Sequence, residues 1–317
     1  MLHLRLITPA DRTADVVRLI EHTVGTTHLV VMEGAARNPR GDVVMCDVAR
    51  EAGDELLTGL QDLGIEDNGS IAVENIDLSL SRRGTKAEAE APGEAADAVL
   101  WDHLTDATHE ESTLSFTYLA FITLATMIAA CGVVLDNAIL IVGAMAVGPE
   151  FGPLAGISTS IVRRRPRLAA RSLVALLVGF AVAMVVTVGF SLFMDAVGLF
   201  TEAQLEGERP QTSFVYAPDW FSFVVAVLAG AAGTLSLTSA KSGALVGVAI
   251  SVTTVPAAAN AAVAFAYGDR AQTWGSTEQL LLNLLGIILA STLTLLAQKW
   301  FWSKTRQTLK PRAGQRT

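Results

Sequence analysis

The sequence predicts a small α+β domain followed by a polytopic helical membrane domain. Three observations support this fold class. The 317 residues are 51% hydrophobic with a mean hydropathy of +0.44, which is too apolar for an ordinary soluble chain. Almost all of the apolar sequence follows Ser112, where it falls into segments long enough to span a bilayer. The first third instead alternates between strand-like and helix-like patterns.

Residues 1–81 predict a soluble ferredoxin-like domain with the order βαββαβ. Strand-like alternation marks four segments, and helical apolar periodicity marks two. In chain order these are strand 2–7, helix 14–23, strands 28–36 and 42–49, helix 51–64 and strand 70–80. Asn38-Pro39-Arg40-Gly41 predicts the hairpin turn between the second and third strands. Ferredoxin-like sandwiches host many functions, so this fold indicates none in particular.

Residues 82–111 predict a polar linker and then a juxtamembrane helix. The linker sequence is rich in charged and small residues. From residue 95 onward, apolar side chains such as Trp101 and Leu104 fall on one side of a helix, with acidic residues on the other. We expect this helix to lead into the bilayer.

Residues 112–303 predict six transmembrane helices, and 304–317 predict a basic cytoplasmic tail. The expected spans are 113–135, 137–161, 168–194, 218–239, 242–266 and 279–302. The loop 163–167 is almost entirely arginine, as is typical of cytoplasmic loops, whereas the loop after the third span is acidic. We therefore expect a multi-pass protein of the cell membrane with both termini in the cytoplasm.

The segment 137–161 carries the features that predict a functional site. Glu150 lies near its middle, where a charge costs at least about 2.5 kcal/mol on insertion scales. Pro149 and Pro153 have no N–H group, so in a helix the carbonyls of Met145 and Pro149 lose their partners. Such backbone is tolerated at membrane depth only where it faces protein, water or an ion. We expect a broken or kinked helix at the centre of a transport or binding site.

A row of small residues in the same segment predicts close helix packing, within the chain or between subunits of a homo-oligomer. Its members recur at every fourth position: Ala144, Gly148, Gly152, Gly156 and Ser160.

The segment Gly243–Ala264 echoes the second span. Each has Val-Gly near its start and a proline nine or ten residues later. Three spans followed by three would invert the second half, and paired Gly/Pro-interrupted segments in two inverted halves predict a site near the bilayer midplane. Pro256 would free the carbonyl of Val252. The expected binding residues are Met145, Pro149, Glu150, Pro153, Ser251, Val252, Thr253, Thr254, Pro256 and Asn260.

Three stretches resemble a known family. They are LIVGAMAVGPEFGPLAGIS (Leu140–Ser158), the preceding STLSFTYLAFITLATMIAACGVVLDNA and the later GVAISVTTVPAAANAA. They are similar to the bacterial and archaeal membrane proteins called domain of unknown function 389, over most of 100–302. The resemblance implies an N-terminal ferredoxin-like domain, a multi-helix membrane domain and no established substrate. It also implies a mostly apolar residue at position 150, so a role for Glu150 would belong to a subgroup.

Two hypotheses from different classes follow. In the first, the chain is a transporter or channel for a small solute or ion, and Glu150 binds a cation or proton. In the second, it is a membrane sensor or scaffold whose ferredoxin-like domain binds a ligand or partner. Alternatively, Glu150 has a purely structural role, as a hydrogen-bonded or paired acid that fixes helix packing, with Lys241 as one candidate partner.

Other classes are not expected. The sequence has no G-x-S-x-G, H-E-x-x-H or P-loop motif, so we expect no catalytic residues. Two cysteines, Cys46 and Cys131, fall in different domains, so no disulfide framework or Cys-based metal site is expected. The net charge of −8 argues against nucleic acid as a partner. We expect no cofactor, and the lipid bilayer and an unidentified solute or ion as partners.

Overall fold

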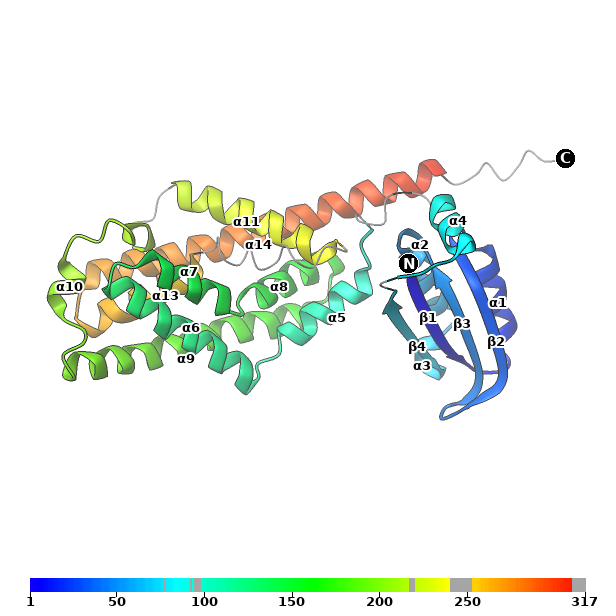
Figure 1. The fold of residues 1–317 in the computed structure, drawn as a ribbon, viewed down its shortest axis with the longest axis horizontal. Helices are drawn as coiled ribbons and strands as arrows, with labels where there is room; N and C mark the ends of the chain where they lie inside the picture. Colours follow the sequence, from blue (N-terminus) through cyan, green and yellow to red (C-terminus); the bar gives the residue numbers. More distant parts are fainter. Residues whose placement is uncertain (77, 92, 94–97, 217–219, 240–252, 310–317) are drawn as a thin grey trace. The chain divides into compact units, whose positions relative to one another are not determined.

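A computed structural model describes the chain except residues 77, 92, 94–97, 217–219, 240–252 and 310–317 (Figure 1). The described residues form two compact units, each with its own hydrophobic core. The N-terminal unit comprises residues 1–102 with short pieces from later in the chain, and the helical unit comprises most of 103–299. Three helices that lie mainly in the helical unit have their end residues counted with the N-terminal unit, namely α5 (Trp101–Glu111), α11 (Trp220–Thr238) and α14 (Arg270–Leu309).

The N-terminal unit is built on a four-stranded antiparallel sheet. Its strand order is β2-β3-β1-β4. The elements are β1 (Leu2–Thr8), α1 (Thr13–His22), β2 (Thr26–Arg37), β3 (Arg40–Val48), α2 (Arg50–Asp62), α3 (Ile65–Asn68), β4 (Ser70–Asn75) and α4 (Arg82–Glu90). The predicted α+β character of this region is confirmed, with every expected strand and helix present.

Alternation along the strands places one face of the sheet in the core. Leu2, Leu4 and Leu6 of β1 are buried, and in β3 Val44 and Cys46 are buried likewise. The core that they form is completed by the apolar faces of α1 and α2. Each helix therefore owes its position to the burial of one apolar stripe.

Helix α4 lies where the sequence predicts a polar linker. Ser81 begins it as an N-cap, because its side-chain oxygen accepts a hydrogen bond from the Gly84 N–H group. Gly84 and Ala87 are the buried residues of this otherwise polar helix. So few apolar contacts give no clear periodic pattern, which is why the sequence does not predict the helix.

Asp42 links the start of β3 to α1 and β2. Thr13 Oγ1 donates a 2.6 Å hydrogen bond to its Oδ2, and Gly34 N donates a 2.8 Å bond to its Oδ1. The bond from Thr13, followed by that from Gly34, lowers the pKa of Asp42 from its ordinary value. A lowered folded pKa contributes stability that is present above the unfolded pKa and lost as the pH falls through the folded pKa.

We therefore expect Asp42→Asn to lower the Tm of the full chain at neutral pH. The difference from wild type should shrink as the pH is lowered toward about 3, because the wild-type carboxylate then becomes protonated. Differential scanning fluorimetry across this range measures the effect. Asp11→Asn is the matched control, since the Asp11 side chain is 81% exposed. A Tm difference that does not change with pH would contradict the assignment.

The helical unit contains the apolar part of the chain. Its elements are α5 (Trp101–Glu111), α6 (Phe116–Val134), α7 (Ala138–Val147), α8 (Phe151–Arg163), α9 (Pro166–Ala196), α10 (Glu202–Glu206), η2 (Ser213–Val215), α11 (Trp220–Thr238), α13 (Thr254–Ala266) and α14 (Arg270–Leu309). Among the described residues, α6, α9, α11 and α14 are long and apolar enough to cross a membrane. The pair α7 and α8 adds a fifth span if its two helices are counted as one.

These helices suggest a membrane protein, and with the α7–α8 pair counted as one they coincide with five of the expected spans. Of the remaining span, 242–266, the structure describes the second half, which is helix α13. Every residue of α13 from Thr254 to Ala264 is buried, and the helix packs against α6, α7 and α9. Its alanines permit this close approach. Helix α13 is therefore a central element of the helical unit.

Candidate functional site

The apolar segment expected as the second span is broken between α7 and α8, at Gly148, Pro149 and Glu150. The two helices are bent by 52° and appear as separate segments in Figure 1. Pro149 lies in the break, and Pro153 is the third residue of α8, where a helix needs no N–H donor. Met145 lies near the end of α7, and Pro149, four residues on, has no N–H group to offer its carbonyl. The prolines thus end one helix and begin another.

Glu150 occupies the N-cap position of α8 and is only 4% exposed. Thr254 Oγ1 donates a 2.8 Å hydrogen bond to its Oε1. Its Oε2 is also buried and has no hydrogen-bond partner among the described residues. A buried carboxyl oxygen without a partner is costly, so this atom marks a place where a ligand would be stabilising.

Two helices begin at this carboxylate. Glu150 immediately precedes α8, and Thr254 is the first residue of α13, so their hydrogen bond joins the two helix N-termini. Unsatisfied N–H groups give a helix N-terminus a partial positive charge, which favours a carboxylate nearby. Pro256 is the third residue of α13, as Pro153 is of α8. The sequence similarity of the two segments is therefore matched by their local structure.

A hollow of about 400 Å³ lies beside the break. Gly148, Pro149 and Gly152 line one part of it, and Glu111 and Tyr118 line another. The Tyr118 hydroxyl is buried without a hydrogen-bond partner among the described residues. Sequence reasoning missed both Glu111 and Tyr118. The first lies at the end of α5 outside any span, and the second is a single aromatic residue in an apolar helix.

The row of small residues lies on two helices rather than one. Ala144 is in α7 and Gly148 is in the break, while the other three are in α8. A Cβ atom at Gly156 would overlap Ser172 Oγ and lie 2.5 Å from Ser112 Oγ. A Cβ atom at Gly152 would lie 2.5 Å from the Glu111 Cβ atom. The glycines therefore allow close packing within this chain.

Asn260 lies in a second polar cluster, around the buried Arg209. One Arg209 Nη atom donates a 3.0 Å hydrogen bond to Asn260 Oδ1, and the other donates to Gln272 Oε1. The guanidinium lies 4.7 Å from the centroid of the Tyr216 ring. Burial lowers the pKa of Arg209, and the charges of Tyr216 and Asp136 oppose that shift.

Thr253 belongs to neither of these clusters directly. Its hydroxyl oxygen accepts a 2.7 Å hydrogen bond from Asn283 Nδ2. Ser251, Val252 and Lys241, which the sequence analysis also names, lie outside the described residues. Of the expected binding residues, the structure therefore brings Glu150 together with Thr254 and places Asn260 with Arg209.

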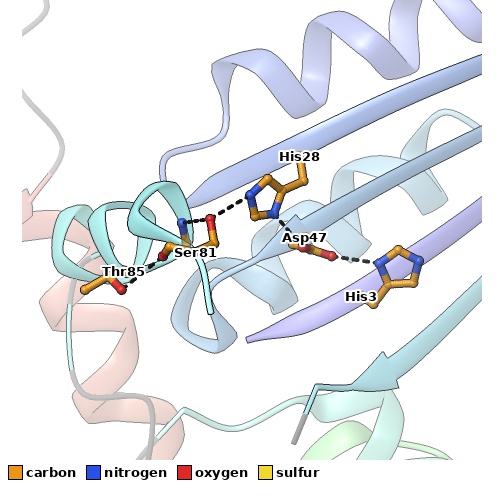
Figure 2. Close-up of polar contacts among 6 residues, drawn as sticks. His3, His28, Asp47, Ser81 and Thr85 are labelled. Atoms are coloured by element: carbon orange, nitrogen blue, oxygen red, sulfur yellow. Dashed lines mark hydrogen bonds and ion pairs between the residues drawn. The ribbon is translucent and has the colours of Figure 1, made fainter. Parts of the chain in front are cut away.

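The N-terminal unit has a polar cluster of its own, shown in Figure 2. Asp47 holds two imidazoles, with Oδ1 2.7 Å from His3 Nδ1 and Oδ2 2.7 Å from His28 Nδ1. His28 Nε2 lies 2.9 Å from Ser81 Oγ, the N-cap of α4. Asp47 lies between the core residues Cys46 and Val48, so this cluster is on the opposite face of the sheet.

Ser81, His28 and Asp47 are connected by hydrogen bonds in the same sequence of residue types, serine to histidine to aspartate, as in a catalytic serine triad. Hydrolysis also requires donors aimed at the developing oxyanion of a substrate. The Gly84 N–H group is instead directed at the Ser81 oxygen itself, as a helix cap. We interpret the cluster as a tether that joins α4 to three strands of the sheet.

The helical unit thus has helices long and apolar enough to cross a membrane, a broken apolar helix pair and a buried carboxylate. Residues 145–289 match the family model described as Domain of unknown function (DUF389). An uncharacterized protein of Methanocaldococcus jannaschii is 24% identical over 204 residues, which cover 64% of this chain and 61% of that protein. No solved structure matches. The two matches confirm the DUF389 resemblance, and residues 145–289 carry it.

Proposed function

We propose that this chain is a membrane transporter or channel in which Glu150 binds a cation or proton. The observation that carries the proposal is the Glu150 carboxylate, buried at a helix break with one oxygen unpartnered among the described residues. Intramembrane acids are expensive and usually functional. If Glu150 only fixed helix packing, a second partner for Oε2 would be expected.

The chemistry of the break supports a hard cation as the ligand. Carboxylate, hydroxyl and carbonyl oxygens suit such ions. Glu150 and Thr254 supply the first two, and the last carbonyls of α7 have no partner within their own helix. The hollow beside the break, with Glu111 and Tyr118 in its wall, would give access to the site.

We further propose a six-span domain made of two inverted three-helix repeats, preceded by a ferredoxin-like domain. The matching third-position prolines of α8 and α13 support the repeat. The order β1-α1-β2-β3-α2-β4 and the sheet order β2-β3-β1-β4 support the ferredoxin-like topology. The arginine-rich loop 163–167 supports cytoplasmic termini in a cell membrane. Catalysis is not part of this proposal.

The test compares the thermal stability of detergent-purified wild type and Glu150→Gln across pH 5 to 8 with a panel of ions and small solutes. A ligand at a hundredfold excess over its Kd stabilises the folded state by about 2.7 kcal/mol. We expect at least one ion or a proton to stabilise wild type, and Glu150→Gln to lose this response while it remains folded.

Thr254→Val is the companion variant, because it removes the hydroxyl that bonds Glu150 Oε1 and keeps the carboxylate. It should weaken the response without abolishing it. If wild type and Glu150→Gln respond alike to every ligand, Glu150 is a packing residue and the proposed site is wrong. Ligand binding would then be sought in the N-terminal domain, as a sensor would require.

A further inference from the structure

One face of α14 carries a row of polar side chains inside the helical unit. Gln272, Ser276, Gln279 and Asn283 follow one another at intervals of four, three and four residues, which places them on one helix face. The last three are at most 1% exposed. We call these four residues the α14 polar row. Leucines such as Leu285, which is 62% exposed, occupy another face of the same helix.

Hydrogen bonds connect the α14 polar row to α13 at two levels. Asn260 Nδ2 donates a 2.7 Å hydrogen bond to Ser276 Oγ. Asn283 Nδ2 donates a 2.7 Å hydrogen bond to Thr253 Oγ1. Thr253 directly precedes Thr254, the residue that contacts Glu150. The row therefore leads to the residue beside the proposed site.

The other end of the row reaches Arg209. This residue lies in the segment between α10 and η2, and its guanidinium bonds both Gln272 and Asn260. Asp136 also anchors this segment, because its Oδ1 accepts hydrogen bonds from Gln211 N and Thr212 Oγ1. Two hydrogen-bonded groups thus lie along the row, one from Arg209 to Ser276 and one from Gln279 to Thr253 beside the helix break.

The row is incompletely satisfied in its middle. Gln279 Nε2 makes only a 3.5 Å contact to Asn283 Oδ1, and Gln279 Oε1 is buried without a partner among the described residues. A ladder that served only helix packing would satisfy such groups, because a buried unpaired acceptor costs about 1–3 kcal/mol. Water or a polar solute would supply the missing partners.

We infer that the α14 polar row lines an aqueous pathway between Arg209 and the Glu150 site, and that its solute is small, polar and uncharged or anionic. This inference rests on the proposed function and names the solute class for it. Amides and hydroxyls both donate and accept hydrogen bonds, so they suit an uncharged polar solute. The guanidinium of Arg209 would repel cations at that end. Glu150 would then bind a coupling cation or proton.

Cysteine labelling tests the pathway without knowledge of the solute. Cys46 and Cys131 are first replaced by alanine, and the folded protein is reconstituted into liposomes. Single Ser276→Cys, Gln279→Cys and Leu285→Cys variants are then treated with membrane-impermeant methanethiosulfonates. Ser276→Cys is nearly isosteric and should preserve the fold even if Gln279→Cys does not.

We expect positions 276 and 279 to react at least about tenfold faster than position 285, because only a hydrated thiol ionises readily. The exposed Glu202→Cys variant supplies the reference rate for each reagent. Relative to this reference, the anionic reagent should be favoured over the cationic one at position 276 by about fivefold, owing to Arg209.

If positions 276 and 279 react as slowly as position 285 in folded protein, the row is a dry packing surface and the pathway is refuted. If they react but favour the cationic reagent, the assigned solute class is wrong. Neither outcome depends on Glu150. Positions 276 and 279 could be labelled while wild type and Glu150→Gln respond alike to every ligand. The pathway would then be supported, and the proposed site at Glu150 would be wrong.

Discussion

Gly148→Ala is expected to destabilise the chain by about 1–3 kcal/mol, the usual cost of forcing an extra methyl group into a packed site. The added Cβ atom would overlap Glu150 Oε2 and lie 2.9 Å from Val255 Cγ2. Val255 is fully buried and cannot move away easily, and a shift of the Glu150 carboxylate would strain the hydrogen bond from Thr254 to its Oε1. The substitution should also abolish ligand responses that depend on Glu150.

Gly143→Ala is the matched control in the same span. A Cβ atom at Gly143 would meet nothing within 4 Å. Alanine is preferred over glycine within a helix by about 0.5–1 kcal/mol, so this variant should be as stable as wild type or more so. Thermal unfolding in detergent compares the two variants. Equal effects of both substitutions would show that the carboxylate does not occupy the space beside Gly148.

Arg209→Met is expected to produce the second large loss, about 2–5 kcal/mol of unfolding free energy, since each buried acceptor left unpaired costs about 1–3 kcal/mol. The Asn260 and Gln272 oxygens would lose the donors described above. The contact with the Tyr216 ring would also lose its positive charge.

Arg270→Met controls for the removed charge, because Arg270 is exposed at the start of α14. Its substitution should change the unfolding free energy by less than about 0.5 kcal/mol. Arg209→Lys should recover part of the loss, since one ammonium group can donate to both amide oxygens. Denaturant titration measures all three variants. If Arg209→Met and Arg270→Met had the same unfolding free energy, the Arg209 cluster would not contribute to stability.

The helix break could be predicted because its causes are local. Pro149 and Pro153 forbid a continuous hydrogen-bond ladder, and Glu150 stands out in an apolar sequence. The contact between Glu150 and Thr254 joins residues 104 positions apart. The two similar Gly/Pro segments predict that their helices meet, because an internal repeat is visible in a single sequence.

The Arg209 cluster could not be predicted in the same way. Arg209 lies in a loop, and its partners Asn260 and Gln272 are 51 and 63 residues away. The sequence predicts Asn260 beside Glu150, whereas the structure places it beside Arg209. Asn260 lies six positions after Thr254, which is about 9 Å along a helix at 1.5 Å per residue, so Asn260 reaches other partners.

The spacing of the α14 polar row is visible in the sequence, although the predicted last span does not include all of it. The expected last span begins at residue 279, whereas the helix begins at Arg270. Gln272 and Ser276 therefore fell outside the predicted span, and the regular spacing of the four polar residues was divided. Polar residues at helical spacing across the end of an apolar segment are the signal that would have revealed the row.

The edge strand β2 bears on how copies of this chain can assemble. It is 12 residues long and forms one border of the sheet, yet its pairing with β3 has register shifts between Thr27 and Val30 and between Met32 and Ala36. Such irregularities twist an edge and interrupt the row of free backbone groups that another strand would need. Strand addition along β2 is therefore disfavoured, even though Val30, Val31 and Met32 are each about 40% exposed. We therefore expect the N-terminal domain to resist aggregation through strand addition at this edge.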